Sequence, residues 1–430
     1  MPPGASRTLN VLATEPTRKG PDRGRDRRLA YLGLAMAMGF IAAAVASLAL
    51  PADLRLGWWL PLHLALAGAA GTAIAAMLPF FVAALAVATP APPALRAAGI
   101  ALVSIGAAVA AIARVAGGAE LGGNLAAAGG GAMYVAGIVA VGLSAGLPLR
   151  RAGGTRRPAT EVAYAVALAD VAVGVTLAIL VLGGEPDVTA VWARLRVAHA
   201  WLNAFGFVAL AIAGTLLHLA PTVAGSRIRP RRAGLLAVAG LAAGAPALAL
   251  GYGLAVDTVA RVGALLAIAG SAALVAHGAG AHRDRAGWTT EHDWHRFTAG
   301  SLLLAPVWLL IAVAIAGGRT IVLGADPAAW RAPDALAPLV VGFVLQVLLG
   351  ALAHLLPAIG PGTPARHAAA RRVLGHGATL RLAAWNLGSG GLTAGLVLGL
   401  DVLVAAGVAL VMASLGATLL LLLICLRERW

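Results

Sequence analysis

The chain has 430 residues, of which 60% are hydrophobic and only 11% are charged, and its mean hydropathy is +0.89. Soluble domains average about 45–50% apolar and about 25% charged residues. This composition excludes a water-soluble globule, because too few polar residues are present to cover its surface. A single cysteine, Cys425, excludes an internal disulfide scaffold. The composition predicts an integral membrane protein that crosses the lipid bilayer many times.

The segment 1–28 differs from the rest of the chain. It is rich in Pro, Gly and Arg, which predicts a disordered basic tail. The apolar run that follows, Leu29–Leu50, is longer than the core of a signal peptide, which usually has about 7–15 residues. We therefore interpret this run as the first membrane span. Residues 29–430 are predicted to form a single transmembrane domain.

Twelve segments are long enough to cross a bilayer as a helix, which takes about 20 apolar residues. They are residues 29–50, 57–88, 95–116, 122–148, 161–183, 196–222, 233–254, 257–280, 297–317, 336–358, 379–400 and 402–426. Clusters of Pro, Gly and charged residues separate them. The sequence therefore predicts an all-α fold, a polytopic membrane bundle of twelve transmembrane helices.

The basic residues predict the orientation of this bundle. The formal net charge is +15, which on a soluble domain would suggest nucleic-acid binding. With a cytoplasmic amino terminus and twelve crossings, 25 of the 32 Lys and Arg residues fall in cytoplasmic segments. That asymmetry follows the positive-inside rule and accounts for the charge without a nucleic-acid partner. We expect a multi-pass protein of the cell (plasma or inner) membrane, with both termini cytoplasmic.

Two of the predicted spans match each other when position 206 is aligned with position 342. Residues 206–221 read GFVALAIAGTLLHLAP and residues 342–357 read GFVLQVLLGALAHLLP, with eight of sixteen positions identical. The span 57–88 joins the pattern more faintly, because the same offset relates His63 to His199. These spans are four helices apart and run in the same direction. We expect three pseudo-repeats of four helices each, with continuous helices.

Polar and glycine residues form one stripe on each of two matching spans. A stripe of this kind is predicted to face the bundle, because polar groups that face lipid are costly. On span 196–222 the stripe is His199, Asn203, Gly206, Leu210, Gly214 and His218, and on span 336–358 it is Gly342, Gln346, Gly350 and His354.

The histidines of these spans are predicted to lie in two layers. His199 and His218 are separated by about 28 Å of helix, given the fixed rise per residue, so they lie near opposite membrane faces. His63 shares the outer layer with His199, whereas His354 and His277 share the inner layer with His218. Two facing histidines can supply both axial ligands of a haem, and three at one depth would suit copper or zinc. The alternative is a structural role in helix–helix hydrogen bonds.

Other polar residues give weaker signals. Asp170 lies in the middle of span 161–183, where an isolated carboxylate indicates a proton path, an ion site or an Arg partner; the alternative is a buried hydrogen bond. His292 and His295 have a His-x-x-His spacing, but Thr290 and Asp293 have the spacing of a capping box. That pattern favours a helix start over a metal site.

Twelve helices, a threefold repeat and histidines at both membrane faces resemble the haem-copper oxidase subunit I superfamily, which includes the nitric-oxide-response proteins called NnrS. The resemblance covers roughly residues 57–360. It implies three arcs of four helices with cofactors held between them. By this resemblance His63 matches a haem ligand, His199 and His218 lie on a copper-ligand span, and His354 lies on a haem-ligand span.

Two departures from the family pattern limit what the resemblance implies. The span Ala233–Leu254 has no histidine, whereas the oxidases carry an adjacent pair for copper there. The span 336–358 has one histidine, where the oxidases have two. The resemblance therefore implies a relative with a degenerate copper site, one that binds haem or copper without the complete oxygen-reducing chemistry.

Three hypotheses follow for the function. The first is an integral membrane protein that binds haem, copper or both, in electron transfer or in nitric oxide or copper handling, with a redox partner in or outside the membrane. The second is a secondary transporter that uses Asp170, Asn203 and Gln346 as midplane contacts, which predicts inverted repeats and interrupted helices. The third is a non-catalytic partner subunit of a membrane complex, in which the histidines are structural.

Overall fold

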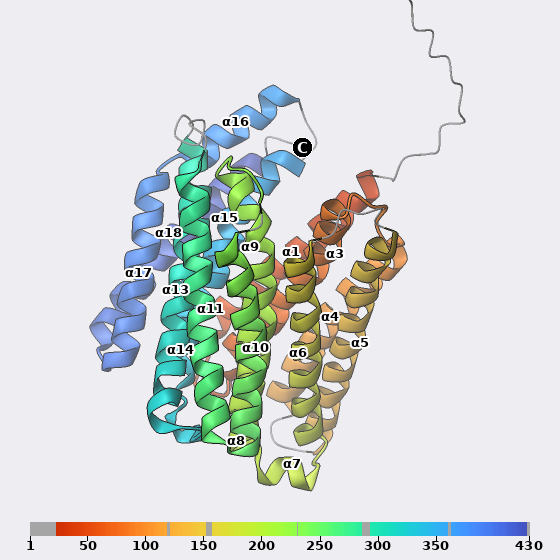
Figure 1. The fold of residues 1–430 in the computed structure, drawn as a ribbon, viewed down its shortest axis with the longest axis vertical. Coiled ribbons are helices and arrows are strands. Elements are labelled where there is room, and N and C mark those ends of the chain that lie inside the picture. Colours follow the sequence, from red (N-terminus) through yellow and green to blue (C-terminus); the bar gives the residue numbers. More distant parts are fainter. Residues whose placement is uncertain are drawn as a thin grey trace, which may run out of the picture.

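A computed structural model describes residues 23–117, 121–151, 157–229, 231–285, 293–359 and 363–427. Every regular element in these ranges is a helix, and the long helices run side by side along the long axis of the molecule (Figure 1). Eleven of the described helices are long and apolar enough to cross a membrane. They coincide with eleven of the twelve predicted spans. The prediction of an all-α, multi-pass membrane protein is therefore confirmed.

Three of the membrane-crossing rods are composite, because a π-helix interrupts an α-helix in each. We call them the composite spans. They are α2–η1–α3 (Trp59–His63, Leu64–Ala70, Gly71–Leu85), α8–η2–α9 (Trp192–Ala200, Trp201–Ala209, Leu210–Val223) and α14–η4–α15 (Ala332–Ala337, Pro338–Leu345, Gln346–Ile359). The sequence predicted uninterrupted helices, and the π segments are therefore a difference between prediction and structure.

The remaining rods are ordinary α-helices. They are α1 (Arg23–Ser47), α4 (Pro93–Ala116), α5 (Leu121–Arg151), α6 (Pro158–Leu182), α10 (Arg232–Leu254), α11 (Asp257–Arg283), α13 (Asp293–Leu323), α17 (Ala378–Leu398) and α18 (Asp401–Arg427). Helix α1 begins within the predicted tail 1–28, of which the segment 1–22 lies outside the described part. The pattern that predicted a capping box at Thr290 also lies outside it.

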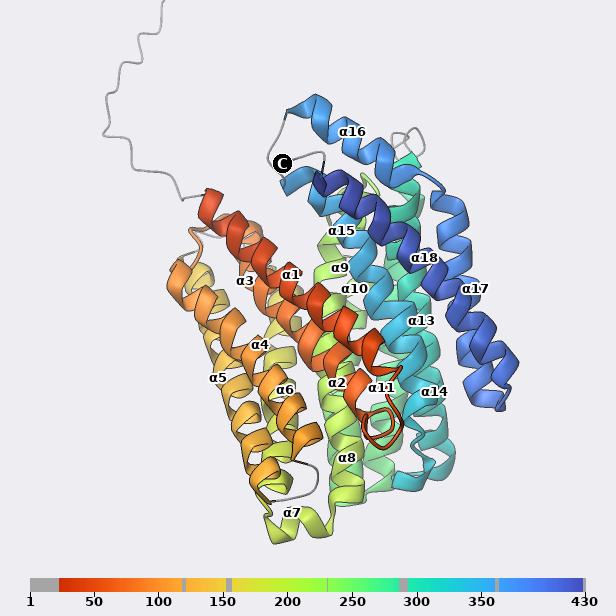
Figure 2. The same ribbon diagram turned by 180° about the vertical axis from the view of Figure 1, so that it is seen from behind.

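Three short helices lie at the ends of the bundle. They are α7 (Pro186–Ala190), η3 (Pro327–Ala329) and α16 (Pro364–Gly375). Helix α16 is at the top of Figure 1 and α7 at the bottom, and we use the names α16 end and α7 end for the two ends of the bundle. Each composite span runs from the α7 end to the α16 end, which Figure 2 shows from behind.

The three π-helices occur at a constant spacing. They begin at Leu64, Trp201 and Pro338, so the interval from the first to the second equals the interval from the second to the third. π-Helices are rare and occur mostly as single turns inserted in α-helices. Ala/Gly/Leu-rich composition does not by itself explain three of them at equal intervals.

Each π-helix contains a glycine whose missing side chain makes room for a residue of the preceding long helix. A Cβ atom built on any of these glycines would collide with that residue. The pairs are Gly68 with Phe40 of α1, Gly206 with Asp170 of α6, and Gly342 with Trp308 of α13. A second contact recurs about two turns toward the α16 end. These pairs are Gly33 with Ala76, Gly214 with Ala163, and Gly350 with Ser301. The same two-helix packing, in the same register, therefore occurs three times.

Three helical hairpins complete this pattern: α4–α5, α10–α11 and α17–α18. In each, glycines let the two backbones approach closely, so that an added Cβ would meet backbone atoms of the partner helix. The pairs are Gly106 with Gly130, Gly240 with Gly270, and Gly388 with Gly407. Small residues at helix contacts are typical of membrane proteins, where close van der Waals packing stabilises the bundle.

Helix α17 covers the twelfth predicted span, residues 379–400, but it is not among the eleven candidate spans. Its polar residues account for the lower apolar character. The Arg381 side chain is buried and donates to the His376 carbonyl oxygen at 3.1 Å and to Thr418 Oγ1 of α18 at 3.0 Å. Asn386 Oδ1 accepts a hydrogen bond from Trp308 Nε1 of α13 at 2.8 Å.

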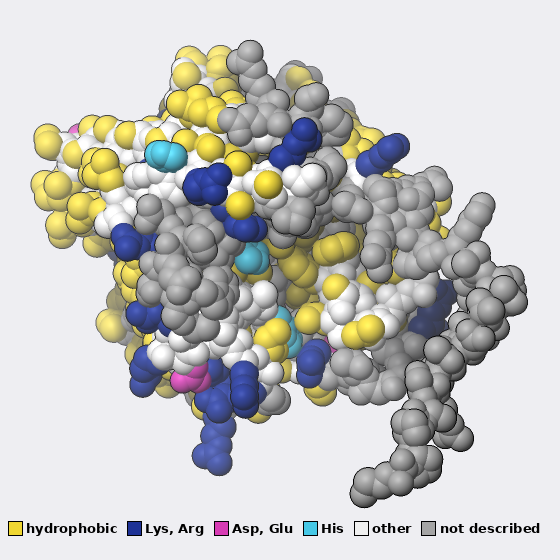
Figure 3. Space-filling view, turned by 90° about the horizontal axis from the view of Figure 1, so that it is seen from above, with side chains coloured by type: hydrophobic (Ala, Val, Ile, Leu, Met, Phe, Trp, Pro, Cys, Tyr) yellow, Lys and Arg dark blue, Asp and Glu magenta, His cyan; other side chains and the backbone are white. Residues whose placement is uncertain are grey.

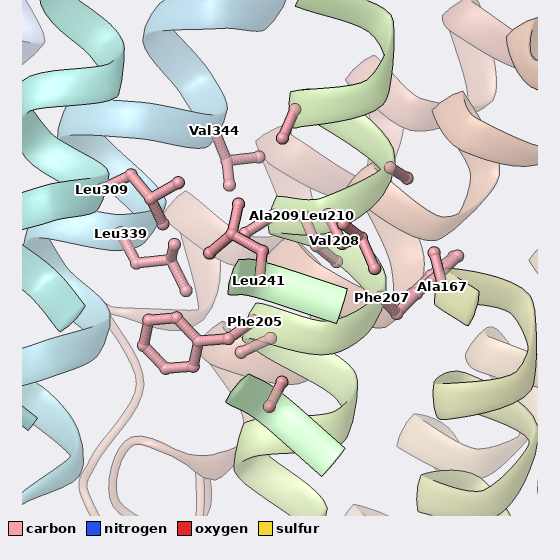
Figure 4. Close-up of a cluster of buried hydrophobic side chains, with 14 of the residues drawn as sticks. Ala167, Phe205, Phe207, Val208, Ala209, Leu210, Leu241, Leu309, Leu339 and Val344 are labelled. Atoms are coloured by element: carbon pink, nitrogen blue, oxygen red, sulfur yellow. The ribbon is translucent and has the colours of Figure 1, made fainter. Parts of the chain in front are cut away.

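The composite spans form the centre of the bundle. In their most apolar windows 61%, 78% and 67% of the residues are buried, compared with 50% or less in the other eight candidate spans. The middle composite span is the most buried of the three. Figure 4 shows Phe205 of η2 on the side of Leu241 of α10, Leu309 of α13 and Leu339 of η4, and Phe207 on the opposite side, beside Ala167 of α6. Residues that face inward on these spans are consequently removed from lipid.

Candidate functional site

Two histidines from different composite spans meet near the α7 end. His63 is the last residue of α2, directly before η1, and His199 lies in α8, just before η2. Their ring centroids are 6.3 Å apart and their planes differ by 21°. The predicted outer-layer residues are thus side by side in the structure, at the start of two of the three π-helices.

Hydrogen bonds fix the tautomer of both rings. Nδ1 of His63 lies 2.7 Å from the Trp59 carbonyl oxygen, and Nδ1 of His199 lies 2.8 Å from the Gly174 carbonyl oxygen of α6. A carbonyl oxygen can only accept, so Nδ1 of His63 carries the proton. At His199 the Gly174 carbonyl oxygen requires a proton on Nδ1, while the Asn203 amide nitrogen, 3.1 Å from the same atom, is a competing donor; the shorter carbonyl contact favours the Nδ1–H tautomer. Both Nε2 atoms are left with a lone pair, and neither has a hydrogen-bond partner among the described residues.

This arrangement is typical of histidines that bind a metal. Such residues donate the other ring N–H to a backbone carbonyl, which fixes the orientation of the ring and raises its basicity. With metal–nitrogen distances of about 2.0–2.1 Å and about 1.1 Å from ring nitrogen to ring centre, one metal between two Nε2 atoms needs centroids about 6 Å apart. The observed centroid separation of 6.3 Å is close to this length, and the two rings are stacked with their planes 21° apart.

Tryptophan side chains surround the pair. The Trp59 ring stacks on His63 with a centroid distance of 4.1 Å, and the Trp192 ring lies 6.1 Å from His199. These aromatic contacts were missed by the sequence analysis, although the four-residue spacing from Trp59 to His63 is a signal that could have found one of them. Each imidazole therefore has an aromatic neighbour on its own helix.

No third ligand joins the pair. In the ranges that the structure describes, no three His, Cys, Asp or Glu side chains converge closely enough to hold a metal ion. The alternative of three imidazoles at one depth therefore finds no support in those ranges. The donor set at the α7 end is two neutral imidazoles, the set that an axially ligated haem iron uses.

The predicted inner layer is arranged differently. His218 Nε2 lies 2.9 Å from Thr160 Oγ1 of α6. His354 lies near Arg371 of α16. His277 is buried on α11 against Leu217 of α9 and the backbone of α10 at Gly234. His218 and His277 are thus close enough to interact electrostatically, whereas His354 lies near Arg371.

Removing the Thr160 hydroxyl tests the structural role of this inner contact. We expect Thr160→Val to lower the free energy of unfolding by about 1–3 kcal/mol, because the half-buried His218 Nε2 loses its partner. Denaturant unfolding in detergent micelles would measure the change. Thr176→Val, which removes an exposed hydroxyl of the same helix, is the control and should stay within about 0.5 kcal/mol of wild type.

Asp170 lies deeper in the same interface. It is 6% exposed, and its Oδ2 atom has no hydrogen-bond partner and no ion pair among the described residues. The Arg partner and the buried hydrogen bond considered for it are therefore not present at that atom. The Asp170 side chain of α6 fills the space left by Gly206 of η2. One turn nearer the α7 end the contact is reversed, because the Asn203 side chain of η2 fills the space left by Gly174 of α6. Two of the three predicted midplane contacts thus share one interface.

Gln346, the third predicted midplane residue, is elsewhere. It is buried on α15, in a small apolar pocket that Phe297, Ser301 and Trp385 help to line. Neither atom of its amide group has a hydrogen-bond partner among the described residues. The structure therefore separates Gln346 from Asp170 and Asn203, which it brings together.

A cavity of about 110 Å³ lies between the composite spans, on the α16 side of the π-helices. Apolar residues of α3, α9 and α15, such as Met77, Ile212 and Val347, form most of its wall. Tyr164 and Thr215 contribute the hydroxyl groups, which are 2.8 Å apart. The sequence analysis missed this cavity, because it forms where three helices distant in sequence meet.

The chain was compared with known proteins by sequence. No protein-family model matches it, and no curated protein matches it.

Proposed function

We propose that the bundle consists of twelve membrane-spanning helices in three four-helix units, α1–α5, α6–α11 and α13–α18, with α17 as the twelfth span. The equal spacing of the π-helices, the repeated glycine contacts and the three glycine-packed hairpins support this layout. We also propose that the α16 end is cytoplasmic. Lys and Arg side chains outnumber acidic ones on that face in Figure 3, as the positive-inside rule requires.

We propose that the protein is a membrane metalloprotein that holds a haem or a copper ion between His63 and His199. The observation that carries the proposal is the pair of imidazoles 6.3 Å apart, each with Nδ1–H bound to a carbonyl and Nε2 left for a ligand. The resemblance to the haem-copper oxidase superfamily agrees with it. The same pair is compatible with a member of that superfamily that lacks some of the metal-binding histidines.

Each residue at this site has a defined task. The Trp59 and Gly174 carbonyl oxygens hold the two rings in the tautomer that leaves Nε2 unprotonated. Trp59 and Trp192 lie beside the two imidazole rings. A bound haem or copper would supply one-electron redox chemistry or a site for nitric oxide. Electron transfer, or nitric oxide or copper handling with a redox partner, is the function that this site supports best.

An absorption spectrum and a metal analysis of the purified protein test the proposal. From cells supplied with haem and copper, we expect either a Soret band with a sharp reduced α-band or about one copper ion per chain. His63→Ala and His199→Ala should each remove that signal, because one imidazole is lost from a two-imidazole site. His376→Ala is the matched control, since His376 is exposed and distant in the fold.

Two results would contradict the metal site. One is a colourless, metal-free wild-type protein from cells that load haem and copper into other membrane proteins. The other is a wild-type spectrum or metal content in both the His63→Ala and the His199→Ala variant.

A secondary transporter is the second candidate function. It is favoured by the shared position of Asp170 and Asn203 at one interface and by the π segments that interrupt three spans. Against it, the repeated spans run parallel, whereas the transporter hypothesis predicts inverted repeats. A substrate gradient that drives uptake into vesicles containing the metal-free protein would favour this second function.

A further inference from the structure

Polar side chains recur along the interface between α6 and the middle composite span. From the α16 end, Thr160 Oγ1 pairs with His218, and Tyr164 Oη pairs with Thr215 Oγ1 at 2.8 Å. Farther toward the α7 end, the Asp170 side chain lies against Gly206, and the Asn203 side chain lies against Gly174. We call this interface the α6 seam. It extends from one histidine, His218, to another, His199, at the opposite end.

The other two copies of this interface are a control within the same molecule. The space that Asp170 fills at Gly206 is filled by Phe40 at Gly68 and by Trp308 at Gly342. In the register that these contacts define, Tyr164 corresponds to a leucine in both other copies. Asn203 corresponds to an alanine and a leucine. The positions are Leu34 and Leu302 for Tyr164, and Ala65 and Leu339 for Asn203. Packing of these helices therefore does not require a tyrosine hydroxyl, a carboxyl or an amide at these three positions, and only the α6 seam has all three. The α13 copy has a polar side chain of its own, Ser301, at the second glycine contact.

Asp170 is the one carboxyl group on the seam. It is 6% exposed and has no ion pair among the described residues. An unpaired carboxylate in a membrane is costly, so the neutral acid is the form that this site accommodates. Around α6, the titratable residues away from the helix ends are Tyr164, Tyr134 of α5, Tyr252 of α10, and His199 and His218 of the composite span. None of them is a permanent cation that would hold Asp170 ionised.

We propose that the α6 seam conducts protons across the membrane, with Asp170 as its central protonatable group. Hydroxyl groups of Thr160, Tyr164 and Thr215 carry the proton on the α16 side of Asp170, and the Asn203 amide hydrogen-bonds water on the α7 side. Asp170 takes up a proton from one side and releases the same number to the other. Each proton moves one positive charge, so a counter-ion must move to sustain the flow.

One step of the path needs water. Tyr164 and Asp170 are separated by about 9 Å along α6, given the rise per residue of a helix, which is too far for a direct hydrogen bond. The cavity at Tyr164 and Thr215 has a volume of about 110 Å³. The wall of this cavity is apolar apart from these two hydroxyl groups, and Asp170 does not line it. The proton path therefore requires water to enter between Tyr164 and Asp170.

Proton flux into proteoliposomes tests the proposal without any cofactor. The protein is reconstituted into vesicles that contain a trapped pH-sensitive dye, and an outward K⁺ gradient with valinomycin drives protons inward. We expect dye acidification well above that of protein-free vesicles. Asp170→Asn should reduce the rate at least tenfold, because the amide cannot exchange a proton, and Asp170→Glu should retain part of it. Tyr164→Phe should also reduce the rate, whereas Thr176→Val, an exposed site on α6, should not.

Three outcomes would overturn the proposal. They are a wild-type rate equal to that of empty vesicles, an undiminished rate in Asp170→Asn, and a rate that depends on a Na⁺ gradient rather than on pH. Size-exclusion chromatography checks that each variant is folded. If Asp170→Asn does not fold, the variants Tyr164→Phe and Thr215→Val test the path instead. A wild-type rate of proton flux in both of them would contradict it. A metal-free wild-type protein that conducts protons would contradict the metal site and leave this proposal intact.

Discussion

Replacing Arg319 with methionine should lower the free energy of unfolding by about 3–5 kcal/mol, the usual cost of removing one partner of a buried ion pair. Arg319 Nη2 of α13 donates to Asp334 Oδ2 of α14 at 2.6 Å, and the Asp334 side chain is only 1% exposed. The second partner, Arg331, is 58% exposed and 3.5 Å away, so it compensates weakly. Without Arg319 the carboxylate stays buried with one solvent-exposed cation, Arg331, at 3.5 Å.

A double variant separates the loss of the ion pair from the loss of packing. Arg319→Met combined with Asp334→Leu removes both charges, and it should recover most of the stability because no unpaired charge remains. Unfolding in mixed detergent micelles, followed by circular dichroism, would measure all three proteins. A single variant within about 1 kcal/mol of wild type would contradict the expectation.

A valine at Gly270 is expected to separate α10 from α11 and to lower the free energy of unfolding by about 3 kcal/mol or more. A Cβ at Gly270 would lie 2.7 Å from the Leu241 backbone nitrogen and 2.9–3.0 Å from backbone atoms of Gly240. Backbone atoms cannot rotate away as a side chain can, so the helices themselves must move. The same unfolding measurement, with the yield of folded protein, reports the effect.

The matched control for this variant lies on the same helix. Gly278 of α11 has open space where its Cβ would be, with no atom within 4 Å. Gly278→Val should therefore leave the free energy of unfolding within about 1 kcal/mol of wild type. Equal effects of Gly270→Val and Gly278→Val would mean that helix propensity, rather than the α10–α11 contact, determines the loss.

The positions of the spans followed directly from the sequence. A bilayer requires about 20 apolar residues per helix, and this local condition does not depend on how the helices pack. The depth of each histidine is equally local, because the rise per residue is fixed. For that reason His63 and His199 could be predicted to share a layer. The match between residues 206–221 and 342–357 likewise exposed the two glycines, Gly206 and Gly342, that lie in equivalent π-helices.

What the sequence could not determine was the rotation of each helix about its axis and the identity of its neighbours. His218 and His354 occupy equivalent positions in the repeat, yet His218 binds Thr160 of α6 while His354 lies near α16. A repeat specifies depth, whereas the partner depends on which helix packs beside it.

Amino-acid order alone thus established an α-helical membrane protein with polar residues on particular helices, since hydrophobic length and helical rise act within each segment. Only the tertiary structure decided that Asp170 lies at Gly206 where Phe40 and Trp308 lie in the other two copies, and that two imidazoles face each other 6.3 Å apart. Those facts depend on contacts between residues far apart in the chain, including π turns that arise where helices pack, and local sequence preferences do not encode them.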